Sequence, residues 1–387
     1  MNFDLSDDQK MIRDAVRDFA EREIRPLAKE LDEKAEFSVE LTKKIGEMGL
    51  FGMYLPEQYG GQGMDTLSYI MAVEEIARVD SSQAATLAAH NSLGIGPLYY
   101  YGTEEQKMKY LPQLCTGNAL WAFGLTEPDA GSDSRGTKTK AVIKNNEWVI
   151  NGSKIFITNG ASDIAIGSTV QAVTGEDKKG RKEYTTIIVE KGTKGYSTVP
   201  MHGKMMWRAS DTAELYFDDC RVPEANLLGK VGDGSKIMLS TLDNGRLSIG
   251  AMGLGLAQGA FDLAMQYSHE RKQFGKFIYT FQNTGFNMAD AATKIELARN
   301  LLYKACWLKD NKRPFAKEAA MSKLYCSEIA KEVADVAVQI HGGYGLMKDY
   351  DIERFYRDQR LLQIGEGTSE IQRLVIARYL SDEFLGK

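Results

Sequence analysis

The hydrophobic pattern of the first part of the chain is helical. Apolar residues recur every three to four positions after Ser6, which is a plausible N-cap, and Pro26 marks a kink or a boundary in this pattern. A glycine-rich loop over residues 56–63 interrupts the periodicity, which returns from Leu67 to Ala77. The pattern therefore predicts a helical N-terminal domain over residues 1–118.

The pattern changes to short strands beyond residue 119. Runs of β-branched and aromatic residues alternate with turn residues, and they cover residues 148–150, 155–158, 185–189 and 214–217. The pairs Asn145-Asn146 and Asn151-Gly152 are typical of hairpin turns. We therefore expect residues 119–233 to form a small, β-barrel-like domain.

Helical spacing returns at residue 234 and continues to the end of the chain. Two long amphipathic faces, over residues 301–308 and 319–329, predict a helical bundle that spans residues 234–387. The expected fold class is therefore α+β, with an N-terminal helical domain, a middle β-barrel-like domain and a C-terminal helical bundle. This order is that of neither a doubly wound sheet nor a TIM barrel.

Two glycine-rich segments resemble nucleotide-binding loops without meeting their requirements. The run Gly253-Leu-Gly255-Leu-Ala-Gln-Gly259 has the wrong spacing for a dinucleotide fingerprint and follows no predicted strand. We expect these small residues to let two helices pack closely. In the run from Gly229 to Lys236, a serine stands where a phosphate loop requires lysine, so we exclude that motif.

Composition and charge exclude several classes of function. The 387 residues carry a net charge of −5 and no basic block, so nucleic-acid binding has no electrostatic support. No apolar run approaches the length of a membrane span, and the acidic N-terminus is unlike a signal peptide. The four cysteines and four histidines are scattered without metal or redox spacing, which argues against a metal site and for a cytoplasmic protein with reduced thiols.

One carboxylate near the C-terminus stands in an unusual setting. Glu366 lies between Gly365 and Gly367, and Thr368 and Ser369 are good N-cap residues for the apolar-periodic run that follows. The sequence therefore predicts a tight turn that aims Glu366 from the start of a helix. Such a carboxylate suits a general base, whereas an acid favoured by the helix dipole is the plainer interpretation.

Five further segments could carry chemistry, although each could also be a plain turn, strand, loop or ion pair. The segment 123–133 is a strand that leads into a turn rich in backbone N–H and hydroxyl donors, which could hold a flat heterocycle or a phosphate. In the segment 154–160, Phe156 and Thr158 share one face of a strand and suit a flavin ring. The others are 242–246, with an acid and a base on one helix face, 271–282, with an arginine that could bind pyrophosphate, and 339–345, a glycine turn.

In their order along the chain, these segments resemble the acyl-CoA dehydrogenase family, and within it the short-chain or butyryl-like branch. The resemblance covers nearly the whole chain, and its most specific parts are residues 123–133, 154–160, 271–282, 339–345 and 366–370. It implies a homotetramer with one non-covalent FAD per subunit, an acyl-CoA substrate, and an electron-transfer flavoprotein as the electron acceptor.

The resemblance also implies a role for each matching residue, with Glu366 as the catalytic base. Residues that would contact FAD, partly across a subunit interface, are Phe123, Leu125, Thr126, Phe156, Thr158, Arg271, Phe274, Gln282, Gln339, Gly342, Gly343, Thr368 and Glu370. Residues that would contact the substrate are Ser132, Asp243 and Arg246, at its thioester-CoA portion, and Gly367, whose N–H lies beside the base near the acyl chain. Some family members place the base just before the arginine equivalent to Arg246. This chain has Gly245 there, so Glu366 is the only candidate for either arrangement.

The implied reaction is an α,β-dehydrogenation. Glu366 would remove the α-proton, backbone and ribose donors would stabilise the enolate at the thioester carbonyl, and a hydride would leave the β-carbon for the flavin. Burial should raise the pKa of Glu366, against the effect of the helix N-terminus. An oxidase of the same fold is disfavoured because the chain ends at Lys387 without the extra domain of acyl-CoA oxidases, and a non-catalytic FAD protein is disfavoured by the intact Glu366.

One departure from the family pattern bears on the acyl group. The residue before the base is commonly an aromatic, usually tyrosine, and here it is Gly365. The missing ring leaves space that a bulky acyl group or a neighbouring side chain could fill. The segment from Leu87 to Pro97, with Asn91, Gly94 and Gly96, should form a roomy, slightly polar floor. We therefore expect a short acyl group that is α-branched or cyclic, with butyryl as the plain alternative.

Overall fold

The structure is a computed structural model that describes residues 4–176 and 178–386. Its N-terminal helices are α1 (Asp7–Phe19), α2 (Arg25–Lys34), α3 (Val39–Glu47), α4 (Thr66–Ala77), α5 (Ser81–Ala89), α6 (Gly96–Tyr101) and α7 (Glu104–Leu114). Ser6 caps α1 in a capping box with Gln9, which confirms the predicted start of the helix. Pro26 lies in the first turn of α2, directly after the π-helical segment η1 (Ala20–Ile24), so the predicted kink is a change of helix type.

The middle of the chain forms one sheet, which has eight strands within the described residues. The strands are β1 (Leu120–Gly124), β2 (Lys140–Lys144), β3 (Glu147–Thr158), β4 (Ala165–Glu176), β5 (Lys182–Glu190), β6 (Tyr196–Pro200), β7 (Thr212–Pro223) and β8 (Leu227–Leu228). Their order is β6-β7-β3-β2-β4-β5-β8, with β1 parallel to β4. The sheet buries its own apolar core, which includes Trp148, Ile187 and Phe217.

The two predicted hairpin turns have different outcomes. Asn145 and Asn146 have φ angles of 54° and 63° and join β2 to β3 in a tight turn, as predicted. The prediction at Asn151-Gly152 is wrong, because β3 continues through this pair with only a shift of register between Ile150 and Gly152. Since β3 pairs with β2 on one side and β7 on the other, the sheet outweighs the local turn preference of the pair.

The C-terminal part is again helical. It comprises α8 (Gly234–Glu270), the hairpin β9 (Lys272–Gln273) and β10 (Lys276–Phe277), α9 (Gln282–Asp310), α10 (Ala316–His341), α11 (Ile352–Leu362) and α12 (Ser369–Phe384). The expectation that no apolar run approaches the length of a membrane span is wrong for α8, which could cross a membrane by length and composition. Most of that stretch is buried inside the fold, as in the core helix of a globular protein.

The glycines of α8 let neighbouring helices approach closely, as predicted. A Cβ built on Gly255 would lie 2.2 Å from the carbonyl oxygen of Glu74, and one on Gly259 would lie 2.1 Å from that of Arg78. Both carbonyls belong to α4 or its C-terminal cap, so α4 packs backbone to backbone on α8. The resemblance of this run to a dinucleotide fingerprint is therefore a packing feature.

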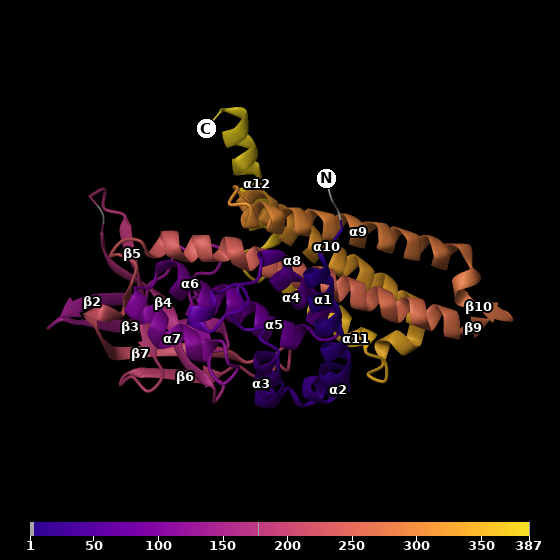
Figure 1. The fold of residues 1–387 in the computed structure, drawn as a ribbon, viewed down its shortest axis with the longest axis horizontal. Coiled ribbons are helices and arrows are strands. Elements are labelled where there is room, and N and C mark those ends of the chain that lie inside the picture. The colour runs from indigo at the N-terminus through magenta and orange to yellow at the C-terminus, as the bar shows by residue number, and fades with distance from the viewer. Residues whose placement is uncertain (1–3, 177, 387) are drawn as a thin grey trace.

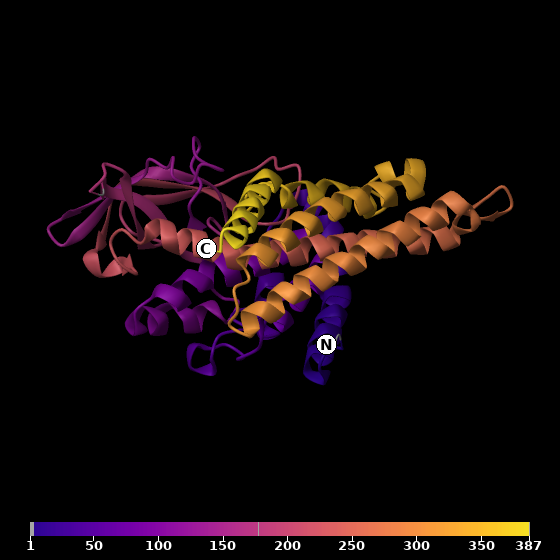
Figure 2. The ribbon, with the colours of Figure 1, turned by 90° about the horizontal axis from the view of Figure 1, so that it is seen from above.

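Figure 1 shows an elongated molecule with the sheet at one end, the β9–β10 hairpin at the other, and α8 running between them. Seen from above, α9 and α10 lie along α8 (Figure 2), and both helices contact it. α12 projects from the body of the molecule (Figure 1) but contacts α10, with an ion pair between Lys317 of α10 and Glu383 of α12. The predicted order of helical, β and helical parts is confirmed.

The predicted domain limits fall between elements. The limit at 118/119 lies between α7 and β1, and the limit at 233/234 lies between β8 and α8. The outer limits at residues 1 and 387 lie outside the described residues. As boundaries of folding units, these limits stay predictions.

Candidate functional site

Glu366 lies on a tight turn between α11 and α12, as predicted. Thr368 is the N-cap of α12 and accepts a hydrogen bond from the backbone N–H of Ile371 at 3.3 Å. Glu366 has a φ of 51°, in the left-handed region that residues with a side chain seldom adopt, and Gly367 has a φ of 94°. The turn therefore holds the glutamate in a special backbone conformation.

The Glu366 carboxylate points at a glycine of α8. A Cβ built on Gly245 would lie 1.7 Å from Oε2 of Glu366 and 3.3 Å from a methyl group of Leu93. Any side chain at position 245 would therefore displace the carboxylate. Oε2 is shielded from solvent and has no hydrogen-bond partner in the described chain, although other atoms of Glu366 keep some exposure. A shielded polar atom without a partner is costly, which is typical of a group that meets its partner in a complex.

Burial raises the pKa of Glu366 to about 7, and the nearby charges of Lys323 and Arg246 oppose that rise. The predicted direction is confirmed, but the predicted opposition from the helix N-terminus is replaced by these two cations. The motif analysis does not identify Lys323. The sequence signal that could have found it is a lysine inside the buried stripe of small residues that runs from Ala319 to Cys326 on α10.

The residues predicted to contact the thioester lie at different depths. Asp243 and Arg246 form an ion pair on α8, and Arg246 is buried with its Nε left without a hydrogen-bond partner in the described residues. Arg246 directly follows Gly245, against which Glu366 packs, and its charge acts on Glu366. Asp243 lines the outer part of a cleft on α8, and Ser132 lies on the exposed loop between β1 and β2. The structure thus places Arg246 next to the base, Asp243 at the cleft and Ser132 at the surface.

Two residues predicted to face the flavin lie at and just after the end of β1. Phe123 and Leu125 are buried and pack with Met238, Leu93 and Leu242. Since Leu93 also contacts the position of Gly245, this edge of the sheet adjoins the Glu366 carboxylate.

A buried ion pair fixes the loop that follows β1. The ammonium group of Lys154 donates to the Glu127 carboxylate at 2.8 Å and to the carbonyl oxygen of Leu125 at 3.1 Å. The backbone N–H of Ile155 donates to the carbonyl oxygen of Thr126 at 3.0 Å. The main chain of Leu125 and Thr126 is therefore held against β3.

Phe156 is presented differently from the prediction. The register of β3 against β7 shifts between Lys154 and Ile157, and Phe156 within this bulge has a φ of 61°. The predicted simple alternation of Phe156 and Thr158 on one strand face is wrong, because the bulge re-aims the aromatic side chain. Phe156 is 64% exposed and Thr158 is half-buried. A large ring held at the surface by an unusual backbone is available to stack on a flat ligand.

Most of the other predicted FAD contacts lie at the far end of α8. These are all exposed: Arg271, Phe274, Gln282, Gln339, Gly342 and Gly343. The guanidinium of Arg271 lies over the ring of Tyr344, 5.6 Å from its centroid, which brings the end of α8 to the glycine turn. A Cβ on Gly342 or Gly343 would meet nothing within 4 Å, so the turn is open to a ligand.

These residues fit an FAD, but in two groups. The exposed Phe156 suits stacking, the main chain after β1 suits the polar edge of a flavin, and Arg271 with the open glycine turn suits a diphosphate. The two groups lie at opposite ends of the molecule, one at the sheet and one by the β9–β10 hairpin (Figure 1). Thr368 and Glu370 belong to neither group and lie on the turn of Glu366 and at the start of α12.

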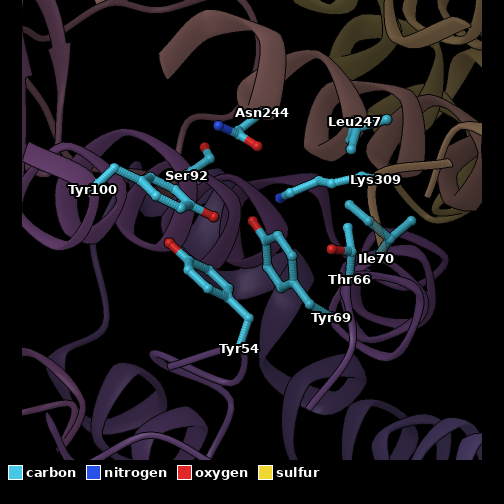
Figure 3. Close-up of a pocket in the computed structure, with 9 residues that line it drawn as sticks. All are labelled: Tyr54, Thr66, Tyr69, Ile70, Ser92, Tyr100, Asn244, Leu247 and Lys309. Carbon is cyan, nitrogen blue, oxygen red and sulfur yellow. The ribbon is translucent and has the colours of Figure 1, made fainter. Parts of the chain in front are cut away.

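A cleft opens beside Gly245, between α4, α8, α9 and the π-helical segment η3 (His90–Ile95). The residues that line its inner part are Tyr54, Thr66, Tyr69, Ile70, Ser92, Tyr100, Asn244, Leu247 and Lys309 (Figure 3). Its outer part has a volume of about 400 Å³ and reaches Asp243. Hydroxyl groups and the Lys309 ammonium point into the cleft, so its largely apolar lining carries several polar groups (Figure 3).

The predicted floor of the substrate site contributes less than expected. The Asn91 amide hydrogen-bonds the main chain of residues 50–52 instead of facing the cleft. Gly94 lets η3 pack closely against β1, because a Cβ there would lie 2.6 Å from the carbonyl oxygen of Trp121. Gly96 does line the cleft. Apart from Asp243 in the outer part, the polar groups of the cleft therefore come from residues that the sequence analysis did not single out.

Comparison with known families gives three consecutive matches along the chain. Residues 6–118 match the N-terminal domain of acyl-CoA dehydrogenases, residues 122–220 the middle domain, and residues 232–381 the C-terminal domain. A probable acyl-CoA dehydrogenase of Bacillus subtilis, YngJ, is 51% identical over 98% of this chain and 100% of its own length. The subunit CarC of the caffeyl-CoA reductase-Etf complex of Acetobacterium woodii is 43% identical over 97% of this chain and 99% of its own.

Solved structures are equally similar. The butyryl-CoA dehydrogenase of Megasphaera elsdenii superimposes with a TM-score of 0.95 at 43% identity, covering 98% of this chain and 100% of that one. An acyl-CoA dehydrogenase of Bacillus anthracis complexed with FAD superimposes with a TM-score of 0.92 at 37% identity, covering 99% of this chain and 68% of that one.

Proposed function

Because the chain belongs to the acyl-CoA dehydrogenase family, it is an acyl-CoA dehydrogenase with FAD as its cofactor, and we propose that Glu366 is its catalytic base. The observation that carries this proposal is the shielded, unpartnered Oε2 of Glu366 against Gly245. Position 245 is where some family members carry the base. The carboxylate of Glu366 thus occupies the space that a side chain at 245 would fill, and both arrangements deliver an acid to one place.

The chemistry assigned to the chain is proton transfer and charge stabilisation. Glu366 accepts the α-proton of the acyl-CoA at its carboxylate, and its raised pKa makes it a stronger base than an ordinary glutamate. The N–H groups of the Glu366–Gly367 turn are donors beside the thioester carbonyl, where negative charge develops. Bound FAD supplies the hydride acceptor for the β-carbon, so the product is a 2-enoyl-CoA.

The base is tested by Glu366→Gln under anaerobic conditions. The variant keeps the shape of the side chain and removes its basicity, so FAD binding should persist while flavin reduction by substrate falls by about 10²–10⁴-fold or more. The measurement is stopped-flow bleaching of the flavin spectrum after mixing with an acyl-CoA. Reduction at the wild-type rate would place the base elsewhere.

We further propose that each FAD is held by two chains of a homotetramer. Phe123, Leu125, Thr126, Phe156 and Thr158 would hold the flavin ring of one subunit. Arg271, Phe274, Gln282, Gln339, Gly342 and Gly343 would hold the adenosine and diphosphate of the neighbouring subunit's FAD. The separation of the two groups within one chain supports this arrangement. Exposed apolar side chains on α12, such as Leu374 and Phe384, provide surface for assembly.

The proposed substrate is a short acyl-CoA with an α-branched or cyclic acyl group. A Cβ on Gly365 would meet the carbonyl oxygen and side chain of Leu361 at ordinary contact distances of 3.5–3.8 Å and nothing closer, which is compatible with space for a bulky acyl group beside the base. The test compares kcat/KM for cyclohexanecarbonyl-, isobutyryl-, butyryl- and octanoyl-CoA. A clear preference for butyryl- or octanoyl-CoA would reject the bulky acyl group and leave the plain short-chain alternative or a longer one.

An electron-transfer flavoprotein is the proposed electron acceptor, in the cytoplasm. The Acetobacterium relative is a subunit of a complex that contains such a flavoprotein, and it is named as a reductase. The direction of the reaction is therefore tested together with the acceptor, by following oxidation of the substrate-reduced enzyme by an electron-transfer flavoprotein and by oxygen. Faster reoxidation by oxygen than by the flavoprotein would favour an oxidase.

A further inference from the structure

The turn that carries Glu366 is anchored by three side chains of α10. Ser327 donates to the carbonyl oxygen of Leu362 at 2.9 Å, and Glu328 accepts from the hydroxyl of Ser369 at 2.7 Å. The third anchor is Lys323, whose ammonium group donates to the carbonyl oxygen of Gly367 at 2.7 Å. Two of these anchors are ordinary polar contacts, whereas the third buries a cation one residue from the base.

Lys323 is fully buried and forms no ion pair of contact distance with any residue that the structure describes. Burial lowers the pKa of Lys323 to about 8, and the Glu366 carboxylate is the strongest of the groups that oppose this fall. Arg246 of α8 adds a like charge, while Glu328 on the same helix and Glu370 of α12 add weaker opposite charges.

A buried ammonium group without an ion-pair partner is destabilising, so Lys323 is expected to have a function that explains its burial. Such a function follows from two opposing requirements on the base, which must be strong and must also be ionised. Burial alone makes Glu366 a strong base but also favours its protonated form near neutral pH, in which it cannot accept a proton. A positive charge beside the carboxylate, which Lys323 carries below about pH 8, favours the ionised form without admitting water.

We propose that Lys323 is a positioning residue for the reaction: its hydrogen bond to Gly367 fixes the turn, and its charge keeps the Glu366 carboxylate ionised and ready to accept the α-proton. This inference rests on the proposed role of Glu366 as the base. In this proposal the hydrogen bond of Lys323 holds the turn, and its charge acts on the ionisation of Glu366. Substitutions at Lys323 can remove one effect without the other.

Three variants divide the tasks. Lys323→Arg keeps both the charge and a donor, Lys323→Gln keeps a donor without the charge, and Lys323→Met removes both. Ser327→Ala is the matched control, because it removes an uncharged anchor of the same turn from the same helix. The rate of flavin reduction by saturating butyryl-CoA is measured from about pH 5 to about pH 9 in the FAD-loaded enzyme, roughly two units on each side of the pKa of the base.

The rate should rise with pH as Glu366 ionises. Without the charge of Lys323 the pKa of Glu366 rises, so this rise should move to higher pH by roughly one unit in Lys323→Gln and Lys323→Met. It should stay in place in Lys323→Arg and Ser327→Ala. Infrared spectroscopy gives an independent readout without substrate. The carboxyl band of Glu366 is identified by its absence from Glu366→Gln, and its titration should move to higher pH in the same Lys323 variants.

An unmoved pH profile in folded, FAD-loaded Lys323→Gln would overturn the inference, as would an equal shift in Ser327→Ala. If both uncharged variants fail to fold while Lys323→Arg folds, Lys323 serves stability and the inference is also overturned. Glu366→Gln separates the two proposals: if it reduces flavin normally, the proposed base is wrong, and if it is inactive while the profiles do not move, only the role of Lys323 is wrong.

Discussion

At the scale of single residues, the position of the Glu366 carboxylate depends on the absence of a side chain at Gly245. Gly245 leaves space for the Glu366 carboxylate that the side chain of any other residue would occupy, since a Cβ there would lie 1.7 Å from Oε2. The contact involves the mobile end of one side chain and a rigid helix. A substitution at 245 is therefore expected to move the carboxylate and leave the helix in place.

Gly245→Ala should separate activity from stability. Alanine is favoured over glycine in a helix by about 1 kcal/mol, which offsets the cost of the displaced carboxylate, so the melting temperature should change little. The rate of flavin reduction should fall at least tenfold, because a base about 1 Å out of place loses its alignment with the α-proton. Gly250→Ala is the control on the same helix, where the new Cβ would meet a methyl of Leu302 at 3.2 Å. Equal losses of rate in both variants would contradict this account.

The pH dependence of the wild-type enzyme follows from the same carboxylate. Its pKa is raised to about 7 by burial, and only the ionised form accepts a proton. The rate of flavin reduction should therefore increase as the pH rises through about 7, and the protonated enzyme below that range should be slow. Stopped-flow reduction at saturating substrate measures this directly. A rate that is constant between pH 6 and pH 8 would show that the Glu366 carboxyl titrates elsewhere.

The sequence predicted Glu366 and missed Lys323 for a physical reason. The glycines and N-cap residues around Glu366 act locally, so the turn could be inferred from neighbours in the chain. The burial of Lys323 depends on how α10 packs against a turn more than forty residues away, which no local pattern encodes. The same distinction explains why the Asp243–Arg246 pair was predicted, since both members lie on one helix.

At the scale of elements, the irregularities in β3 affect how Phe156, a predicted flavin contact, is presented. The strand was expected in two pieces joined by a turn at Asn151-Gly152, and it is one strand with two shifts of register. The second shift turns Phe156 outward, and regular alternation could not have predicted that orientation. The strands themselves follow from β-branched runs, whereas bulges depend on the partner strand.

Phe156→Ala should weaken FAD binding with little effect on the apoprotein. The ring is 64% exposed, so its removal costs few internal contacts, but it removes a stacking surface for the flavin. We expect the dissociation constant of FAD, measured by fluorescence during reconstitution of the apoprotein, to rise several-fold or more. Val199→Ala on β6, another exposed apolar position of the same sheet, is the control. Unchanged affinity in Phe156→Ala would remove it from the cofactor site.

The packing of α8 predicts the opposite outcome for a second glycine of the same helix. A Cβ at Gly255 would lie 2.2 Å from the carbonyl oxygen of Glu74, which belongs to the rigid backbone of α4. Gly255→Ala should therefore lower the free energy of unfolding by about 1–3 kcal/mol or more. Urea denaturation of Gly255→Ala and Gly245→Ala measures the contrast. Equal stability of the two variants would mean that α4 can move away from α8.

At the scale of the whole molecule, the two proposed groups of FAD contacts lie far apart in one chain. Leu242, which packs with Phe123 and Leu125, is in the first third of α8, and Arg271 is its C-cap. At a rise of 1.5 Å per residue they are separated by about 44 Å. Under the proposed assignment, the two groups of FAD contacts serve different cofactors, and a complete site is expected to need residues from two chains.

Mixing two defective enzymes tests this arrangement. Glu366→Gln lacks the base but keeps Arg271, whereas Arg271→Ala keeps the base but loses a contact to the diphosphate. In a mixed oligomer, a Glu366→Gln chain can supply Arg271 to the site that contains the intact Glu366 of the other chain. Co-assembly of the two variants from dissociated subunits should restore activity above the sum of the separate enzymes. A mixture no more active than that sum would place all contacts to each FAD in one chain.

The length of α8 also limits which insertions and deletions the chain can accept during evolution. Removal of seven residues from this helix would keep its apolar face nearly in phase but shorten it by about 10 Å. Such a chain could still bury its core, yet its two half-sites would no longer match those of an unaltered neighbour. In the proposed oligomer, the length of α8 is thus set by agreement between copies and not by the needs of one copy. Insertions and deletions should accordingly accumulate in the loops of the sheet and leave this helix untouched.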